Sequence, residues 1–83
     1  MSVDKAIQAG TMKIGTKQTI KQVEMGAAAE VFVAKDADPR IAGKIINLCK
    51  KHNVKMTSVE TMKQLGKACG IDVGAAMAVR IKD

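Results

Sequence analysis

The sequence has almost no aromatic side chains: Phe32 is its one aromatic residue, and Trp and Tyr are absent. Proteins that bind single-stranded nucleic acid by stacking on the bases need several aromatic rings, so this mode of binding is disfavoured. Hydrophobic residues make up 47% of the 83 residues, which is enough for one packed interior. Aliphatic side chains must therefore fill the core of a single small domain over residues 1–83.

Other classes of protein are disfavoured by what the chain has little of. No apolar run approaches the roughly 18 residues that a membrane helix needs. The stretch from Met1 to Lys5 lacks the charged start and apolar segment of a secretion signal. One histidine and the distant Cys49 and Cys69 do not make a zinc site, and we expect both thiols to be small buried hydrophobes. We therefore expect a cytoplasmic protein with no cofactor, no metal and no membrane partner.

The charge balance points to an anionic partner. The formal net charge is +6 and the pI is near 9.6. These values favour a polyanion, with nucleic acid ahead of a membrane surface, although a merely soluble basic protein is the simple alternative. Arginine occurs only at Arg40 and Arg80, and lysine supplies the other cations. Lysine contacts phosphate as a point charge and rarely reads base edges in a bidentate way, so specificity must come from elsewhere.

Hydrophobic periodicity predicts helices alternating with strands. The expected helices span residues 2–9, 16–25, 38–51 and 61–69, and the expected strands span residues 11–14, 30–34, 54–59 and 75–81. Such alternation is typical of βαβ units and predicts an α/β fold whose mostly parallel or mixed sheet has helices on both faces.

Several residues mark helix ends. Asp38 is a good N-cap and is followed by Pro39 at the first helical position. Asn53 suits the left-handed position that closes a helix, and Thr61 opens a capping box. Gly66 lies in the middle of a helix, where it is expected to permit a close approach of another element.

Gly15 to Lys21 is the segment that most directly suggests a binding site. It follows a short apolar strand and opens a helix, so unpaired backbone N–H groups point outward and favour an anion. Lys17 and Lys21 are four residues apart and share one face of that helix. The side chain of Gln18 can both donate and accept hydrogen bonds, so it can read a base edge while the lysines hold phosphates. The alternative is a solvated helix face with no ligand.

The loops that follow the first three strands could form one edge of the sheet. They are residues 15–18, 35–38 and 59–62, and they would meet if their strands are parallel. Within them, Asp36 and Asp38 are expected to have structural roles, and the sequence places no partner for Glu60. Nothing in the chain nominates a catalytic group.

Three segments in the right order resemble the L7Ae family of ribosomal proteins, closest to its small bacterial members of the YbxF type. They are Gly15 to Lys21, Val33 to Pro39 and Leu65 to Ile71, and the resemblance covers nearly the whole chain. It implies a three-layer α-β-α sandwich with a four-stranded mixed sheet and helices on both faces. It also implies binding of kink-turn RNA, a duplex with a short bulge flanked by tandem sheared G·A pairs.

The resemblance also implies the residues that would contact RNA. In the family, a Gly-x-Asn-Glu-x-x-Lys motif enters the groove at the G·A pairs, and the loop before the last helix packs against the bulged nucleotides. Lys17 here replaces the usual Asn and Gln18 the usual Glu, from which we expect a softer selectivity for guanine. The complete expected set is Gly15, Thr16, Lys17, Gln18, Lys21, Lys35, Val59, Glu60, Thr61 and Met62.

The expected function is therefore non-catalytic recognition and stabilisation of kink-turn RNA by a monomer. The RNA could be ribosomal RNA or a riboswitch. One alternative is an auxiliary structural protein of the ribosome, and a more distant one is an enzyme that binds a nucleotide at the same helix end.

Overall fold

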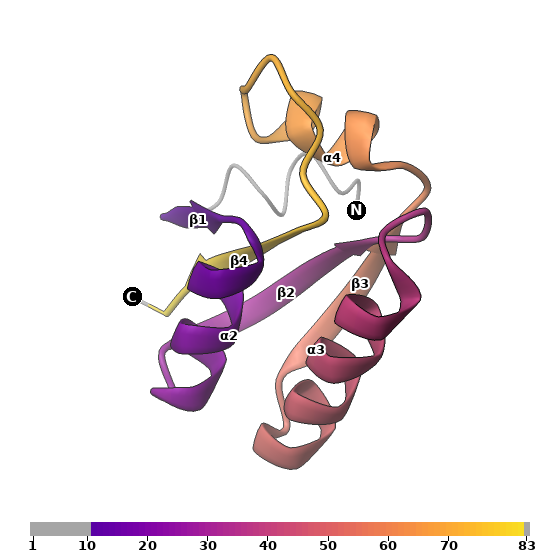
Figure 1. Cartoon of the computed structure of the whole chain (residues 1–83). Helices are drawn as coiled ribbons and strands as arrows, with labels where there is room; N and C mark the ends of the chain where they lie inside the picture. The colour runs from indigo at the N-terminus through magenta and orange to yellow at the C-terminus, as the bar shows by residue number, and fades with distance from the viewer. Residues whose placement is uncertain (1–10, 83) are drawn as a thin grey trace.

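The computed structural model describes residues 11–82, and the helix predicted over residues 2–9 lies outside this range. Figure 1 shows the arrangement of its helices and strands. In chain order these are β1 (Met12–Ile14), α2 (Thr16–Glu24), β2 (Ala28–Ala34), α3 (Pro39–His52), β3 (Lys55–Val59), α4 (Met62–Ala68) and β4 (Met77–Ile81). Within these residues, no helix is long and apolar enough to cross a membrane.

The strands of the described part form one mixed sheet in the order β1-β4-β2-β3. Strands β2 and β3 are parallel, whereas β4 is antiparallel to both of its neighbours, β1 and β2. Because β1 and β2 both oppose β4, the strands β1, β2 and β3 all point the same way. The prediction of a mixed sheet is confirmed. The loops after β1, β2 and β3 were expected to meet if these strands run in the same direction, and they do.

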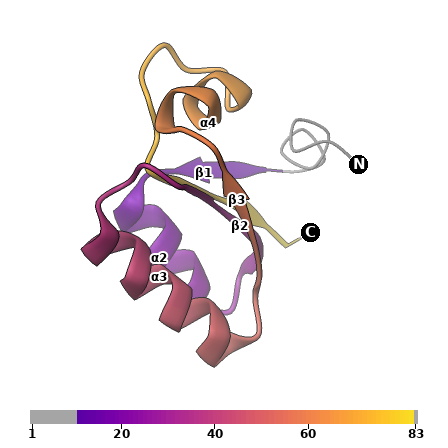
Figure 2. The same ribbon diagram turned by 90° about the vertical axis from the view of Figure 1, so that its right-hand side faces the viewer.

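Helices cover both faces of this sheet, as Figure 2 shows, with α2 and α3 on one side and α4 on the other. Alternation along β2 divides the core between the two sides. Val31 packs in the cluster under α2 and α3, whereas the fully buried Phe32 packs in the cluster under α4. The three-layer α-β-α sandwich is therefore confirmed, with a core that is aliphatic apart from one ring.

The predicted helix ends are confirmed. The carboxylate of Asp38 accepts a hydrogen bond from the backbone N–H of Arg40 at 2.9 Å, and hydrogen bonds from Arg40 lower the pKa of Asp38. Asn53 closes α3 in the left-handed conformation, with φ 56° and ψ 41°. The Thr61 hydroxyl accepts a hydrogen bond from the backbone N–H of Gln64 at 3.0 Å, which caps α4.

Two strand boundaries and one cysteine differ from the predictions. Strand β2 begins at Ala28, two residues earlier than predicted, because Ala28 pairs with Ile81 of β4. Strand β4 begins two residues later than predicted, since the N–H of Ala75 donates to the Met62 carbonyl of α4 instead of joining the sheet. Cys49 is buried as expected, but Cys69 is only half-buried at the end of α4.

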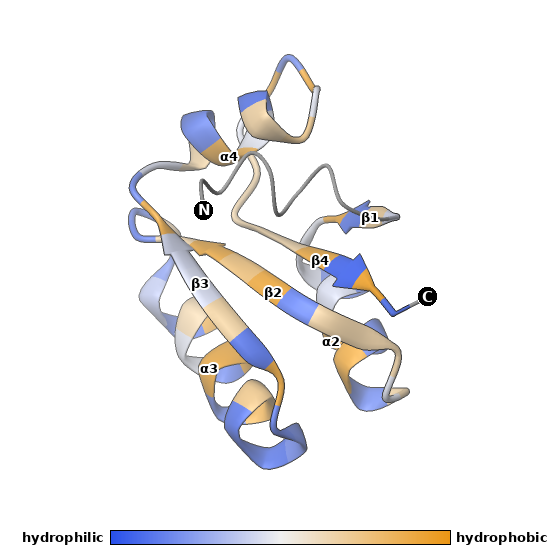
Figure 3. Ribbon diagram, turned by 180° about the vertical axis from the view of Figure 1, so that it is seen from behind, coloured by the Kyte–Doolittle hydropathy of each residue, from blue (hydrophilic) through white to orange (hydrophobic). Residues whose placement is uncertain are grey.

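A polar cluster around the buried carboxylate of Glu30 connects three strands on the α4 side of the sheet. The Thr57 hydroxyl of β3 donates to Oε2 of Glu30 in β2 at 2.6 Å. The guanidinium of Arg80 in β4 lies 3.7 Å from Oε1 of the same carboxylate. Figure 3 shows the corresponding hydrophilic bands across β2 and β4. This cluster holds β2, β3 and β4 in register from within the sheet.

Candidate nucleic-acid interface

The carboxyl ends of β1, β2 and β3 lie at the same end of the sheet, so the three predicted loops meet there. The second and third of these loops are in direct backbone contact, since the N–H of Lys35 donates to the Val59 carbonyl at 2.7 Å. The first loop is held to the start of β4, where the N–H of Gly15 donates to the Met77 carbonyl at 3.0 Å. Because β4 runs in the opposite direction, the segment that enters it, residues 71–76, also lies at this end. These four segments, residues 15–18, 35–38, 59–62 and 71–76, form the loop edge of the sheet.

The segment before β4 was not predicted as part of the site. It carries Val73, which is 70% exposed and so presents an apolar side chain to the solvent at this edge. The order of the strands decides this placement, because only an antiparallel β4 brings its entering segment to the ends of the other strands. The direction of β4 cannot be read from its own residues.

The start of α2 has the features expected of an anion site. Gly15 has a φ of 109°, a backbone conformation that glycine adopts readily. Of the three helices in residues 11–82, α2 alone has no side-chain cap, and its first turn contains no acidic residue. The Thr19 hydroxyl donates to the Gly15 carbonyl at 2.8 Å, which closes this turn from within. The N–H groups of this turn are therefore available to a negatively charged ligand.

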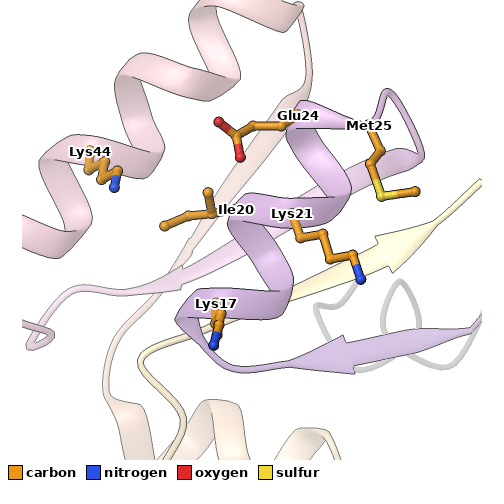
Figure 4. Close-up of a pocket in the computed structure, with 6 residues that line it drawn as sticks. All are labelled: Lys17, Ile20, Lys21, Glu24, Met25 and Lys44. Carbon is orange, nitrogen blue, oxygen red and sulfur yellow. The ribbon is translucent and has the colours of Figure 1, made fainter.

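Side chains that could contact such a ligand surround this helix start. Lys17, Gln18 and Lys21 are exposed, and Thr16 is half-buried. Figure 4 shows Lys17 and Lys21 projecting from α2, with Lys44 of α3 across from them. The three lysines border a shallow surface depression lined also by Ile20, Glu24 and Met25. The positive charge at the start of α2 thus continues along that helix to Lys21 and across to Lys44 of α3.

The loops after β2 and β3 are joined by side-chain interactions. The ammonium of Lys35 lies 2.9 Å from Oε1 of Glu60, so the structure supplies a partner for Glu60 that the sequence did not place. Oδ1 of Asp36 accepts a hydrogen bond from the backbone N–H of Met62 at 2.7 Å, which confirms a structural role for Asp36. The ion pair could not be foreseen, since its partners are 25 residues apart and meet only through the strand register.

Of the predicted loop residues 59–62, only Glu60 offers an exposed side chain. The Val59 side chain packs in the core under α4, and Met62 is half-buried against the same cluster. Thr61 is half-buried, and its hydroxyl is used by the cap of α4. A ligand at this loop therefore meets Glu60, Lys35 and the backbone more directly than the apolar side chains.

Groups for metal binding or nucleophilic chemistry are not gathered anywhere in residues 11–82. This part of the chain contains no group of three His, Cys, Asp or Glu residues that could hold a metal ion. Burial raises the pKa of the thiols of Cys49 and Cys69, which disfavours the reactive thiolate. The exposed features at the loop edge are suited to binding.

The match to known families agrees with this geometry. A sequence model described as the ribosomal protein L7Ae/L30e/S12e/Gadd45 family matches residues 1–83. The chain belongs to this family. The resemblance inferred from the three sequence segments is therefore confirmed, as is the α/β architecture that it implied.

Individual family members include RNA-binding and ribosomal proteins. The chain is 53% identical over 76 residues to the RNA-binding protein YbxF of Geobacillus stearothermophilus, covering 92% of this chain and 93% of the relative. It is 38% identical over 78 residues to the large ribosomal subunit protein eL8 of Halobacterium salinarum, covering 93% of this chain and 65% of that protein. Among solved structures, the 15.5kD RNA binding protein of Giardia lamblia superimposes with a TM-score of 0.85 at 29% identity, covering 98% of this chain and 68% of that chain.

Proposed function

We propose that this protein is a non-catalytic RNA-binding protein that recognises and stabilises kink-turn RNA. Membership of the L7Ae family and the RNA-binding relatives support the RNA-binding role. The observation that carries the finer proposal is the uncapped start of α2, with Lys17, Gln18 and Lys21 exposed beside it and the loop after β3 at the same edge. We further infer that the protein acts as a cytoplasmic monomer.

The proposed mechanism is a shift of the RNA between two conformations. A kink-turn brings two phosphate backbones close together, and their repulsion favours the extended form of the RNA. A protein that binds the kinked form more tightly raises its population in proportion to the difference in affinity. Lysines at a helix start can offset this repulsion without reading base sequence, and recognition then follows mainly from RNA shape.

Several exposed side chains of α2 and the loop edge are each assigned a contact in this proposal. Lys17 and Lys21 contact phosphates, and the N–H groups at the start of α2 add to the same attraction. Gln18 hydrogen-bonds a base edge in the groove. Lys35 contacts a further phosphate near the bulge, and Val73 packs against an unstacked base.

Fluorescence energy transfer between the two ends of a labelled kink-turn RNA tests the proposal. Addition of protein should bring the ends together, because the bound form is sharply bent. The same duplex without its bulge should show no change. If the ends of the kink-turn RNA do not approach at protein concentrations that saturate binding, the proposed recognition is wrong.

Variants of the chain locate the site in the same assay. Replacement of Lys17, Gln18 and Lys21 with alanine should weaken binding of the kink-turn, because phosphate and base contacts are lost together. The matched control replaces Lys50 and Lys51, two exposed lysines near the end of α3, which should have little effect.

A structural role in the ribosome is the second candidate, and the identity to protein eL8 of the large subunit favours it. Such a protein should sediment with ribosomal particles at moderate salt, whereas a free RNA regulator should not. A nucleotide-binding enzyme that uses the start of α2 is the third candidate. Thermal stabilisation by mononucleotides, with none by structured RNA, would favour that reading instead.

A further inference from the structure

Lys35 and Glu60 are neighbours because β2 and β3 are parallel and in register. Ala34 pairs with Val59 at the ends of the two strands, so the next residue of each strand leaves the sheet beside the other. Their ammonium and carboxylate groups lie 2.9 Å apart, with 56% of the Lys35 side chain and 71% of the Glu60 side chain exposed. The sheet therefore places an exposed ion pair at the loop edge, beside the edge strand β3.

Three other acidic side chains lie in the loop edge, and none of them forms an ion pair with a lysine of residues 11–82. One of them, Asp72, is exposed and has no ion pair within these residues. Asp36 accepts a hydrogen bond from the N–H of Met62, and Asp38 interacts with Arg40. Glu60 is thus the carboxylate that neutralises a lysine of the candidate site. By contrast, neither Lys17 nor Lys21 forms an ion pair with any group in residues 11–82. The candidate site thus has two available lysines on α2 and one lysine, at the loop edge, that is already paired.

We propose that the Lys35–Glu60 ion pair determines specificity by withholding Lys35 from RNA that is bound by charge alone. RNA that is held by its shape at the start of α2 displaces Glu60 and brings a phosphate to Lys35. This inference rests on the proposed RNA-binding function. It assigns to Glu60 the role of weakening the binding of RNA that is held by charge alone.

The two kinds of RNA differ in what they gain at Lys35. An exposed ion pair contributes little to stability and can be opened by a competing anion. RNA bound by charge alone moves among many positions and meets a lysine whose charge is already neutralised, so it gains little from opening the pair. RNA held at α2 keeps one phosphate near Lys35 at a high effective concentration, which favours exchange of carboxylate for phosphate.

The salt dependence of binding distinguishes these cases, because each phosphate contact adds to its slope. We compare the wild type with Glu60→Gln on a kink-turn RNA and on the same duplex without the bulge. On the plain duplex, Glu60→Gln should steepen the slope of log affinity against log salt by about 0.7 to 0.9. The loss of affinity from about 50 mM to about 200 mM salt then becomes about threefold larger than for the wild type. On the kink-turn the slope should not change, since the contact to Lys35 is already made.

Two further variants make the test specific to the ion pair. Lys35→Met should have the converse effect, lowering the slope by about 0.7 to 0.9 on the kink-turn and leaving that on the plain duplex unchanged. His52→Lys changes the net charge as much as Glu60→Gln does, because the histidine is neutral at pH 7. His52 is exposed at the last position of α3, away from the loop edge, so its replacement should leave both slopes unchanged.

Several results would overturn the proposal. Equal slopes for the wild type and Glu60→Gln on the plain duplex would mean that Lys35 is not withheld. An equally steeper slope with His52→Lys would assign the effect to bulk charge. If the wild type binds both RNAs equally at high salt, kink-turn recognition is wrong, while the duplex slopes still decide the role of the ion pair. If neither RNA binds, both proposals fail.

Discussion

Gly66 determines where part of the binding surface lies, although it contacts no ligand itself. A Cβ atom added at this position would collide with the carbonyl oxygen of Val73. The N–H of Ile71 donates to the Gly66 carbonyl at 3.0 Å, so the segment before β4 lies directly against α4. The predicted close approach at Gly66 is confirmed, and its partner is the segment that presents the exposed Val73.

Replacement of Gly66 with alanine should destabilise the protein. Alanine favours a helix over glycine by up to about 1 kcal/mol, but the new methyl group must displace the backbone of Val73. We expect the free energy of unfolding in urea to fall by about 1 to 3 kcal/mol, as for other overpacked sites.

Gly43→Ala is the matched control for this change. Gly43 lies within α3, and an added Cβ atom there meets no other group within 4 Å. The same substitution should therefore raise the free energy of unfolding by up to about 1 kcal/mol through helix propensity alone. A Gly66→Ala variant as stable as the wild type would show that the contact with Val73 is not tight.

Among the strands, the cluster of Glu30, Thr57 and Arg80 joins three neighbours through one buried carboxylate. Glu30 is 4% exposed as a residue, and Nε of Arg80 has no hydrogen-bond partner in the described structure. Within residues 11–82, the Glu30 carboxylate therefore has one side-chain hydrogen-bond donor, the Thr57 hydroxyl, and one nearby positive charge, the Arg80 guanidinium. Removing one charge of such a cluster destabilises a protein more than replacing both charged residues with apolar ones, because the remaining charge stays buried without a partner.

Arg80→Met should lower the stability markedly, since it leaves the Glu30 carboxylate buried without a counter-charge. We expect a loss of about 3 kcal/mol in the free energy of unfolding, measured by urea denaturation. The double variant with Glu30→Met and Arg80→Met removes both charges and should recover most of this loss. A double variant less stable than Arg80→Met alone would mean that the cluster stabilises the sheet by more than charge compensation.

At the scale of the whole molecule, the order of elements could be predicted from the sequence, but the order of strands could not. Hydrophobic periodicity and caps such as Asp38 and Thr61 are local signals, and they placed each described helix and strand to within about two residues. Strand order depends on contacts between distant segments, which local patterns do not encode. The insertion of β4 between β1 and β2 is therefore a property that only the structure supplies.

The candidate site could likewise be predicted from the sequence only where its signals are local. Residues 15–18 and Lys21 could be recognised because a strand, a glycine and a helix with lysines follow one another in the chain. The pairing of Lys35 with Glu60 and the exposure of Val73 depend on register and strand direction. Burial of Val59 depends on packing under α4, which the loop sequence does not reveal.

Replacement of Val73 tests whether the binding surface includes the segment before β4, without a change in the charge of the protein. Val73→Ser should weaken kink-turn binding by about tenfold, because an apolar contact worth about 1.5 kcal/mol is lost. Stability should change by less than about 0.5 kcal/mol, as is usual for an exposed position. Met25→Ser is the comparison: Met25 is similarly exposed, at 65%, but lines the depression along α2 and not the loop edge. An equal loss of binding with Met25→Ser would mean that binding does not depend on the position of Val73.

The position of β4 also has a consequence for the order in which the protein folds. The last strand in the described sequence occupies an interior place, between β1 and β2. During synthesis β1 has no strand partner until residues 77–81 have left the ribosome, and the side of β2 that will pair with β4 stays open for the same time. Contacts between such distant segments slow folding, and unpaired strand edges promote association with other chains. The chain therefore completes its sheet only when its final described strand arrives, and a nascent chain that stops before residue 77 lacks the strand that joins β1 to the rest.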